Sequence, residues 1–265
     1  MQDSWDDILE RSQQDNAWWL PAHITTMDRP EIHYTVDSSG PTRLNTVNRV
    51  NPDQRDYDPL VREVMQAHQP QGRSHFSLAR PSQSPALAES LARHGYVLED
   101  MADAWSIEVT AARPPIPDDV RVDRVETLQG LRDMYAVMHA SFPRIDPAKG
   151  ADLAKELSEC SGAQARCRRY VAYDAASGAP LSTGALNLFP DHGVGFMWGG
   201  STVPAARGRG VYTAVVTARM RNAREAGLRR VALYALRKTS GPIIQRQGFT
   251  RHGPVEFWSQ YWENK

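Results

Sequence analysis

The feature that most constrains the fold is a junction between a predicted strand and a predicted helix, VPAARGRGVYTAVVTARM at residues 203–220. An apolar run precedes it, and apolar positions behind it recur at helical spacing. A helix begins with backbone N–H groups that have no partner and with the positive end of its dipole, so an anion can bind there if the backbone can come close. Gly208 and Gly210 carry no Cβ to hold phosphate oxygens away, and the arginines beside them add positive charge. The junction therefore predicts a site for an anionic group such as a pyrophosphate.

Two common nucleotide-binding loops do not match this junction. The ATP-binding loop needs a glycine, four residues and then Gly-Lys-Ser or Gly-Lys-Thr, a string that the chain lacks. The dinucleotide-binding loop needs a third glycine three residues after Gly210, where this chain has Thr213. A plain turn at the start of a helix stays open as the alternative on spacing alone.

The C-terminal part of the chain alternates between strand and helix signals. Thr127 is a predicted N-cap, and Gly227 is a predicted helix end. The expected order is strand, helix, helix, three strands, helix, strand, helix and strand. The segments are 120–126, 127–141, 148–159, 168–203 (three strands, with turns at 177–178 and 191–193), 211–227, 229–236, 240–247 and 255–262. This order predicts an α/β protein with a mixed sheet.

A proline cluster, TAARPPIPDD, interrupts the pattern ahead of these segments. Neither a helix nor a central strand tolerates so many prolines, so residues 110–118 are expected to be an extended linker. We place the linker proper at 113–117, between a domain at 1–112 and a domain at 118–265.

The N-terminal part resembles the second half of the same pattern. Its expected segments are a strand at 43–50, a helix at 57–68, a strand at 74–80, a helix at 84–96 and a strand at 102–109. SPALAESLARHGYVLED and SGPIIQRQGFTRHG each have a serine, a proline-marked helix start, and a glycine with an aromatic residue before a strand. This likeness suggests an internal duplication, and two unrelated α/β segments are the alternative.

The stretch STVPAARGRGVYTAVVTARMRNAREAG resembles the acetyl-CoA loop of the GNAT N-acetyltransferase superfamily. That loop has Gln or Arg, two residues, Gly, one residue, and Gly or Ala, after a strand. Arg207 and Gly210 match its first two fixed positions, and Val203–Pro204 stand where the strand should end. Tyr212 departs from the third position. Gly248–Phe249, after a short helix, resembles the closing Gly-Phe of the superfamily.

The resemblance implies a GNAT fold, an α/β class with an α+β mixed sheet, made of a complete C-terminal domain and a partial, degenerate N-terminal copy. It implies transfer of an acetyl group directly from acetyl-CoA to an amine, without a covalent enzyme intermediate and without a metal. The loop equivalent in the N-terminal copy, NPDQRDYDPLV, has no glycine and three aspartates, so we expect no CoA there. The residues expected to bind acetyl-CoA are Ser201, Thr202, Val203, Arg207, Gly208, Arg209, Gly210, Val211, Tyr212 and Thr213.

The resemblance leaves the catalytic residues unknown. Many members have a proton-donating tyrosine four residues before the closing glycine, where this chain has Ile244. An asparagine that often touches the cofactor has Arg237 as its nearest counterpart, and Ser240 or a water is left as the donor. The candidate bases, by position alone, are Asp191, His192 and Glu256.

Composition narrows the partners. The formal net charge is zero, which gives no field to recruit nucleic acid or an anionic membrane. Cys160 and Cys167 are too few for a disulfide framework or a structural zinc site. We see no leader and no membrane span, which predicts a cytoplasmic protein, monomeric or homodimeric. The leading function is N-acetylation of a small-molecule primary amine. A CoA-binding sensor or scaffold without turnover, and a protein or peptide N-acyltransferase, are the alternatives.

Overall fold

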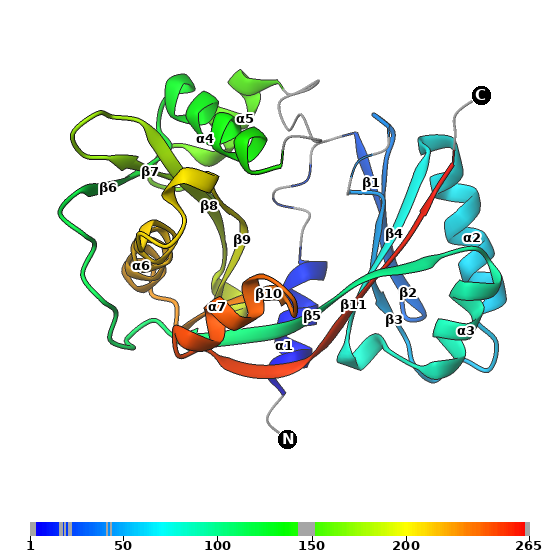
Figure 1. Cartoon of the computed structure of the whole chain (residues 1–265). Helices are drawn as coiled ribbons and strands as arrows, with labels where there is room; N and C mark the ends of the chain where they lie inside the picture. Colours follow the sequence, from blue (N-terminus) through cyan, green and yellow to red (C-terminus); the bar gives the residue numbers. More distant parts are fainter. Residues whose placement is uncertain are drawn as a thin grey trace. The chain divides into compact units, whose positions relative to one another are not determined.

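The computed structural model describes residues 4–15, 18, 20, 23–40, 42, 44–142 and 152–262. The chain divides into two compact units (Figure 1). The first contains Met1–Trp105 and Tyr234–Lys265, and the second contains Ser106–Leu233. The boundaries fall inside strand β5 (Val97–Glu108) and strand β10 (Arg230–Leu236), so each of these strands has residues in both units.

The second unit is built on a mixed sheet with strand order β10-β9-β8-β7-β6. Strands β6 to β9 are antiparallel neighbours, and β10 is parallel to β9. The elements are β6 (Val120–Arg124), α4 (Leu128–Ser141), α5 (Leu153–Cys160), β7 (Cys167–Asp174), β8 (Pro180–Phe189), β9 (Val194–Thr202) and α6 (Val211–Glu225), together with the first part of β10.

Helices α4 and α6 cover opposite faces of this sheet. The Tyr170 hydroxyl of β7 donates a hydrogen bond to Asn222 of α6 at 2.6 Å. The next residue of the strand, Val171, packs instead with Leu131 and Met134 of α4. Because successive side chains of a strand point to opposite faces, the two helices lie on different sides.

The first unit has the strand order β1-β2-β3-β4-β11-β5. Strands β3 and β4 are parallel, whereas β1 with β2, β2 with β3 and β4 with β11 are antiparallel. The elements are α1 (Trp5–Gln14), β1 (Ile24–Arg29), β2 (Ile32–Asp37), β3 (Thr46–Val50), α2 (Asp58–His68), β4 (Arg73–Ala79), α3 (Pro85–Arg93), α7 (Ser240–Arg246) and β11 (Thr250–Tyr261), with parts of β5 and β10.

The two halves of the chain share one order of elements. Each has three consecutive antiparallel strands, a helix, a strand parallel to the third one, a second helix and a long strand. The second helix of each half is followed by a glycine in the left-handed region, Gly95 at φ +85° and Gly248 at φ +81°. A buried aromatic residue follows, Tyr96 or Phe249, and its N–H bonds the carbonyl five residues earlier. This agreement supports an internal duplication.

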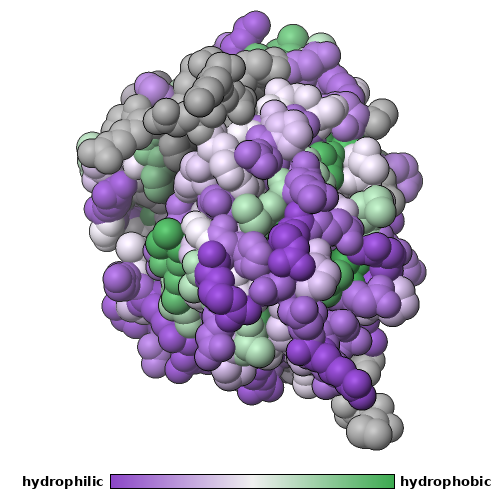
Figure 2. Space-filling model, turned by 90° about the vertical axis from the view of Figure 1, so that its right-hand side faces the viewer, coloured by the Kyte–Doolittle hydropathy of each residue, from purple (hydrophilic) through white to green (hydrophobic). Residues whose placement is uncertain are grey.

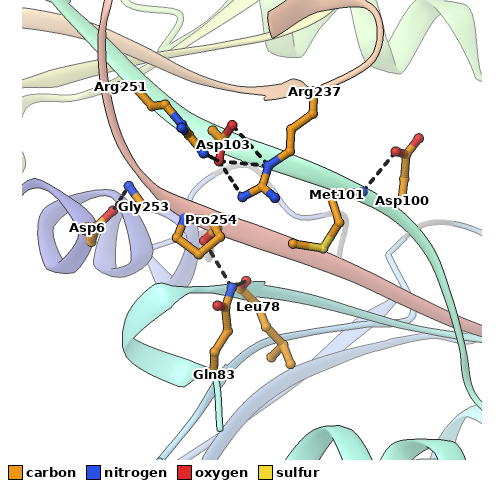
Figure 3. A network of polar contacts seen from close by, with 10 residues as sticks. All are labelled: Asp6, Leu78, Gln83, Asp100, Met101, Asp103, Arg237, Arg251, Gly253 and Pro254. Carbon is orange, nitrogen blue, oxygen red and sulfur yellow. Dashed lines mark hydrogen bonds and ion pairs between the residues drawn. The ribbon is translucent and has the colours of Figure 1, made fainter. Parts of the chain in front are cut away.

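Polar contacts link several elements of the first unit around Asp103 of β5 (Figure 3). Asp103 is 4% exposed and accepts hydrogen bonds from Arg237 and Arg251, each with an Nη2···Oδ1 distance of 2.8 Å. Burial acts to raise the pKa of Asp103, but the bonds from the two arginines outweigh it and hold the pKa below its ordinary value. Nearby, Asp6 of α1 accepts the backbone N–H of Gly253 at 2.9 Å.

Most of the elements predicted from the sequence are confirmed. Thr127 caps α4 through a bond from the Gly130 N–H, and Gly227 follows α6 at φ +77°. The helix expected at 148–159 is seen as α5, and its expected start lies outside the described residues. Helix α1 and strands β1 and β2 were not predicted. Both cysteines are free and buried.

The compact units differ from the division predicted at residues 113–117. Those residues have no regular structure and belong to the second unit, while Tyr234–Lys265 belongs to the first. Strand β11 ends the second repeat along the chain, but it pairs with β4 of the first. The compact units and the duplicated segments therefore divide the chain differently. The division into residues 1–112 and 118–265 stays a prediction for the duplicated segments.

The surface is mainly hydrophilic on the face drawn in Figure 2, where hydrophobic residues form small separate patches. The large hydrophobic side chains that are most exposed are Val97, Tyr261 and Phe142. Within the described part of the chain, no helix combines the length and the apolar character needed to cross a membrane.

Candidate functional site

The glycine-rich loop of the second unit lies between β9 and α6. A short 3-10 turn (Pro204–Ala206) follows β9, and Gly208 and Gly210 then take φ values of +81° and +77°. This left-handed backbone favours glycine. A Cβ on Gly208 would meet open space, and one on Gly210 would come no closer than 3.8 Å to Pro117. Gly210 is the N-cap of α6, and no side chain caps the helix there. The loop therefore exposes a helix start that a large anion can approach.

The two loop arginines have different surroundings. Arg209 donates to Asp119 at 2.8 Å and lies 3.4 Å from Asp174, so two carboxylates offset its charge. Arg207 is exposed, and its Nε donates to the Thr202 carbonyl at 3.3 Å. Arg207 is thus the loop cation that has no carboxylate partner among the described residues. The sequence pattern gave no sign of this difference, because Asp119 and Asp174 lie far away along the chain.

Strand β9 leads into the loop with one edge open beyond its first residues. Its pairing with β10 runs from Val194 to Phe196 and stops there within this unit. On the other edge, the Val203 N–H bonds the Leu181 carbonyl at 2.9 Å. Backbone groups of an antiparallel strand alternate in direction, so those of Thr202 face away from β8. Of the three residues expected along a pantetheine arm (Ser201, Thr202 and Val203), only Thr202 therefore turns its backbone to the open edge.

A β-bulge interrupts β9 just before these residues. Thr183 pairs with Ser201 and Ala185 with Trp198, so β9 has one residue more than β8 between the two pairs. Gly199 takes φ +62°, and a Cβ on Gly200 would lie 2.7 Å from the Tyr212 ring. Sequence reasoning missed this bulge, although two adjacent glycines inside a predicted strand are a recognised signal for one.

Two buried polar groups near the bulge lack partners among the described residues. Arg219 of α6 is 1% exposed; its Nη1 donates to the Ala185 carbonyl at 3.1 Å, while its Nη2 has no partner. Ser201 is 7% exposed, and its hydroxyl is also without a partner. Buried polar groups are normally hydrogen-bonded, so both mark places where a water or a ligand atom can bind. Ser201 is among the residues predicted from the sequence to bind the cofactor, whereas Arg219 was not predicted.

The candidate bases in the second unit lie far from the loop. Asp191 and His192 form the turn between β8 and β9, as their turn-like sequence suggested. They stand at the start of β9, about 26 Å from its end, given the rise of a β-strand per residue. The structure therefore does not place them beside the loop, and their role as bases stays a prediction.

The remaining candidates belong to the first unit and already have contacts there. Ile244 is fully buried. The Ser240 hydroxyl accepts the Leu236 N–H at 2.9 Å, and Arg237 is bound to Asp103. Glu256 accepts the indole N–H of Trp258 at 2.8 Å. None of these residues is thereby assigned a catalytic role.

The loop and strand fit the phosphate end and arm of an acyl-CoA. The positive-φ glycines, the uncapped helix start and Arg207 suit a pyrophosphate, and the open edge of β9 can bond an amide-bearing arm. The Tyr212 ring narrows the space over Gly200, which such an arm would have to pass. Within the described residues, no cluster of three or more His, Cys, Asp or Glu is arranged to hold a metal ion.

The chain was compared with known families, curated proteins and solved structures. No protein-family model matches the chain, and no curated protein matches its sequence. A GCN5-related N-acetyltransferase from Kribbella flavida aligns over 97% of this chain and 95% of its own, at TM-score 0.62 and 14% identity. Another, from Sphaerobacter thermophilus, aligns over 89% and 82%, at TM-score 0.60 and 18% identity. The chain has the GNAT fold.

The GNAT fold extends over both halves of the chain. A tandem GNAT protein from the clavulanic acid biosynthesis pathway aligns over 98% of this chain and 94% of its own, at TM-score 0.59 and 14% identity. A match of that length includes the N-terminal half. The superfamily resemblance found at residues 201–227 is therefore confirmed at the level of the fold, and these identities carry the argument no further than that.

Proposed function

We propose that this protein is an N-acyltransferase that transfers an acetyl group from acetyl-CoA to the primary amine of a small molecule. One observation carries the proposal: an uncapped helix start with two positive-φ glycines directly follows a bulged strand that has an open edge. The GNAT fold supports it, since solved structures described above as N-acetyltransferases have the same fold.

Each part of the loop has a role in this proposal. The N–H groups at the start of α6 bind the pyrophosphate, and Arg207 supplies the cation beside it. Thr202 turns its backbone toward the arm. Acetyl-CoA supplies the activated acyl group, and the protein's task is to hold the thioester next to the amine and to exclude water.

The N-terminal half is proposed to bind no CoA. Helix α2 begins after Tyr57 with no positive-φ glycine, and Asp56 and Asp58 lie at its start. Hydrogen bonds from Ser90 and Arg93 hold the pKa of Asp58 below its ordinary value, so this carboxylate is ionised where a phosphate would have to approach. Like charges at this position disfavour phosphate.

The proposal is tested by calorimetric titration with acetyl-CoA. The wild type should bind one acetyl-CoA per chain, and Gly210→Glu should abolish binding, because it adds a Cβ and a carboxylate at the helix start. Gly178→Glu is the matched control. Gly178 also has a positive φ, +73°, and open space around it, but it lies in the turn between β7 and β8. Binding that survives Gly210→Glu would show that the loop is only a turn.

A sensor and a peptide acylase are the competing functions. An enzyme releases free thiol from acetyl-CoA when an acceptor is added, whereas a sensor binds CoA and releases none. A screen of small amines against short peptides, read by thiol release, then separates a small-molecule acetyltransferase from a peptide acylase.

A further inference from the structure

The residue that departs from the GNAT loop pattern, Tyr212, has a defined place in the second unit. It stands in the first turn of α6, and its ring rests on the backbone of the β9 bulge. A Cβ on Gly200 would lie 2.7 Å from Tyr212 Cε2 and 3.2 Å from the hydroxyl oxygen. Real Cβ atoms do not approach other atoms this closely, so a glycine at position 200 is what lets the ring lie there.

A buried guanidinium also lies near the ring. The Arg219 guanidinium lies 5.8 Å from the ring centroid, and its carbon would be 2.8 Å from a Cβ on Gly184 of β8. Arg219 is buried and donates to the Ala185 carbonyl, so it cannot move away easily. The ring of Tyr212 thus lies close to both the buried guanidinium and the bulge, and its hydroxyl lies close to Gly200.

The Tyr212 hydroxyl itself makes no hydrogen bond to any described residue. Other tyrosine hydroxyls of this unit do: Tyr170 bonds Asn222, and Tyr173 bonds Asp133. A phenol that is held in place but left without a partner is available to bond a ligand atom. This is the observation that points from the packing of Tyr212 to a chemical role.

The route of the ligand follows from the proposed function, on which this inference rests. With its pyrophosphate at the start of α6, the CoA would extend its pantetheine arm back along the open edge of β9. From Thr202 the arm passes next to Gly200. On this route the Tyr212 hydroxyl lies beside the part of the arm that is close to the thioester. The position where many superfamily members have the donor tyrosine is the buried Ile244 in this chain.

We propose that Tyr212 is the proton donor to the leaving sulfur. The new carbon–nitrogen bond forms as the carbon–sulfur bond breaks, and the electron pair of the broken bond goes to sulfur. Tyr212 gives its phenolic proton to that sulfur. The acceptor nitrogen loses a proton to solvent, and the phenolate takes up a proton from solvent. The enzyme thereby returns to its starting state.

A binding experiment tests the contact without any turnover. CoA and desulfo-CoA, which lacks the sulfur, are titrated calorimetrically into the wild type, Tyr212→Phe and Tyr173→Phe. A hydroxyl–sulfur contact should make the wild type bind CoA about threefold more tightly than desulfo-CoA, the size of one weak hydrogen bond. Tyr212→Phe should lose that preference, and Tyr173→Phe, whose hydroxyl faces α4, should keep it.

Turnover provides the second readout, with the acceptor found in the amine screen. Tyr212→Phe should lower kcat about a hundredfold with little change in KM. An unchanged kcat, or an equal preference for CoA in wild type and variant, would overturn the assignment while leaving the proposed function intact. A wild type that binds no CoA at all would overturn the proposed function as well.

Discussion

Glu10 of α1 makes the stability of the first unit depend on pH. Its side chain is buried, 7% exposed, and it accepts a hydrogen bond from the Ser82 hydroxyl at 2.5 Å. Burial is the largest effect and raises the pKa of Glu10 from 4.5 to about 7, although the Ser82 bond and the charge of Arg49 act to lower it. The folded protein therefore keeps a proton on Glu10 that the unfolded chain has already lost.

The sign and size of the effect follow from these two pKa values. Stability is fully present below pH 4.5 and is lost as the pH rises toward 7, because the charged carboxylate must then be buried. Each pH unit between the two values is worth 1.36 kcal/mol, which gives a total of about 3 kcal/mol. Glu10→Gln removes the charge and keeps an oxygen to accept the Ser82 bond. We expect the variant to gain about 3 kcal/mol relative to the wild type between pH 4.5 and pH 8.

The comparison with Glu10→Gln is needed because buried histidines act in the opposite direction. Burial lowers the pKa of His68 from 6.5 to about 4, so its contribution to stability is lost as the pH falls below 6.5. The difference between variant and wild type cancels that effect. The assay is urea unfolding followed by tryptophan fluorescence. Six of the seven tryptophans belong to the first unit and only Trp198 belongs to the second, so the signal reports mainly on the unit that contains Glu10. A difference that stays constant from pH 4.5 to pH 8 would refute the burial argument.

Other substitutions test the packing of each unit. Gly195→Ala would place a Cβ 2.8 Å from Leu186 Cδ1, and we expect a loss of about 2 kcal/mol in thermal unfolding; an unchanged melting temperature would mean that Leu186 can move aside. Asp103→Asn leaves Arg237 and Arg251 facing each other without their shared carboxylate and should cost about 2 kcal/mol in urea at pH 7. Because the pKa of Asp103 is lowered, that cost should shrink as the pH falls through its value in the folded protein. A cost that is the same at pH 7 and pH 3 would contradict the ion-pair explanation.

The loop shows how much of the site could be read from the sequence. The sequence points to Gly208 and Gly210 because a backbone that approaches an anion has no room for a Cβ, and both take the left-handed backbone in the structure. The N-cap at Thr127, the turns before β8 and β9, and the glycine after α6 were also correct. These features depend on φ, ψ and hydrogen bonds within a few residues, which local sequence encodes directly.

The chemistry around the loop could not be read in the same way. Which arginine keeps its charge for a ligand depends on Asp119 and Asp174, and these are brought to Arg209 by the pairing of β6 with β7. The contact of Tyr212 with Gly200 depends on a bulge whose register is set by β8. The burial of Arg219 could not be read from the sequence either, because an arginine-rich helix usually turns its charges to solvent.

The sequence by itself thus determined the order of elements, the helix start built for an anion and the likeness between the two halves. Hydrophobic periodicity and backbone preference act over short segments, so they can be read without knowing which distant residues a segment contacts. The tertiary structure decided which loop arginine has no carboxylate partner among the described residues, where the phenol of Tyr212 lies, and that β11 pairs with β4. These outcomes depend on contacts between residues distant in the chain, where burial and the loss of water give each polar group its partner.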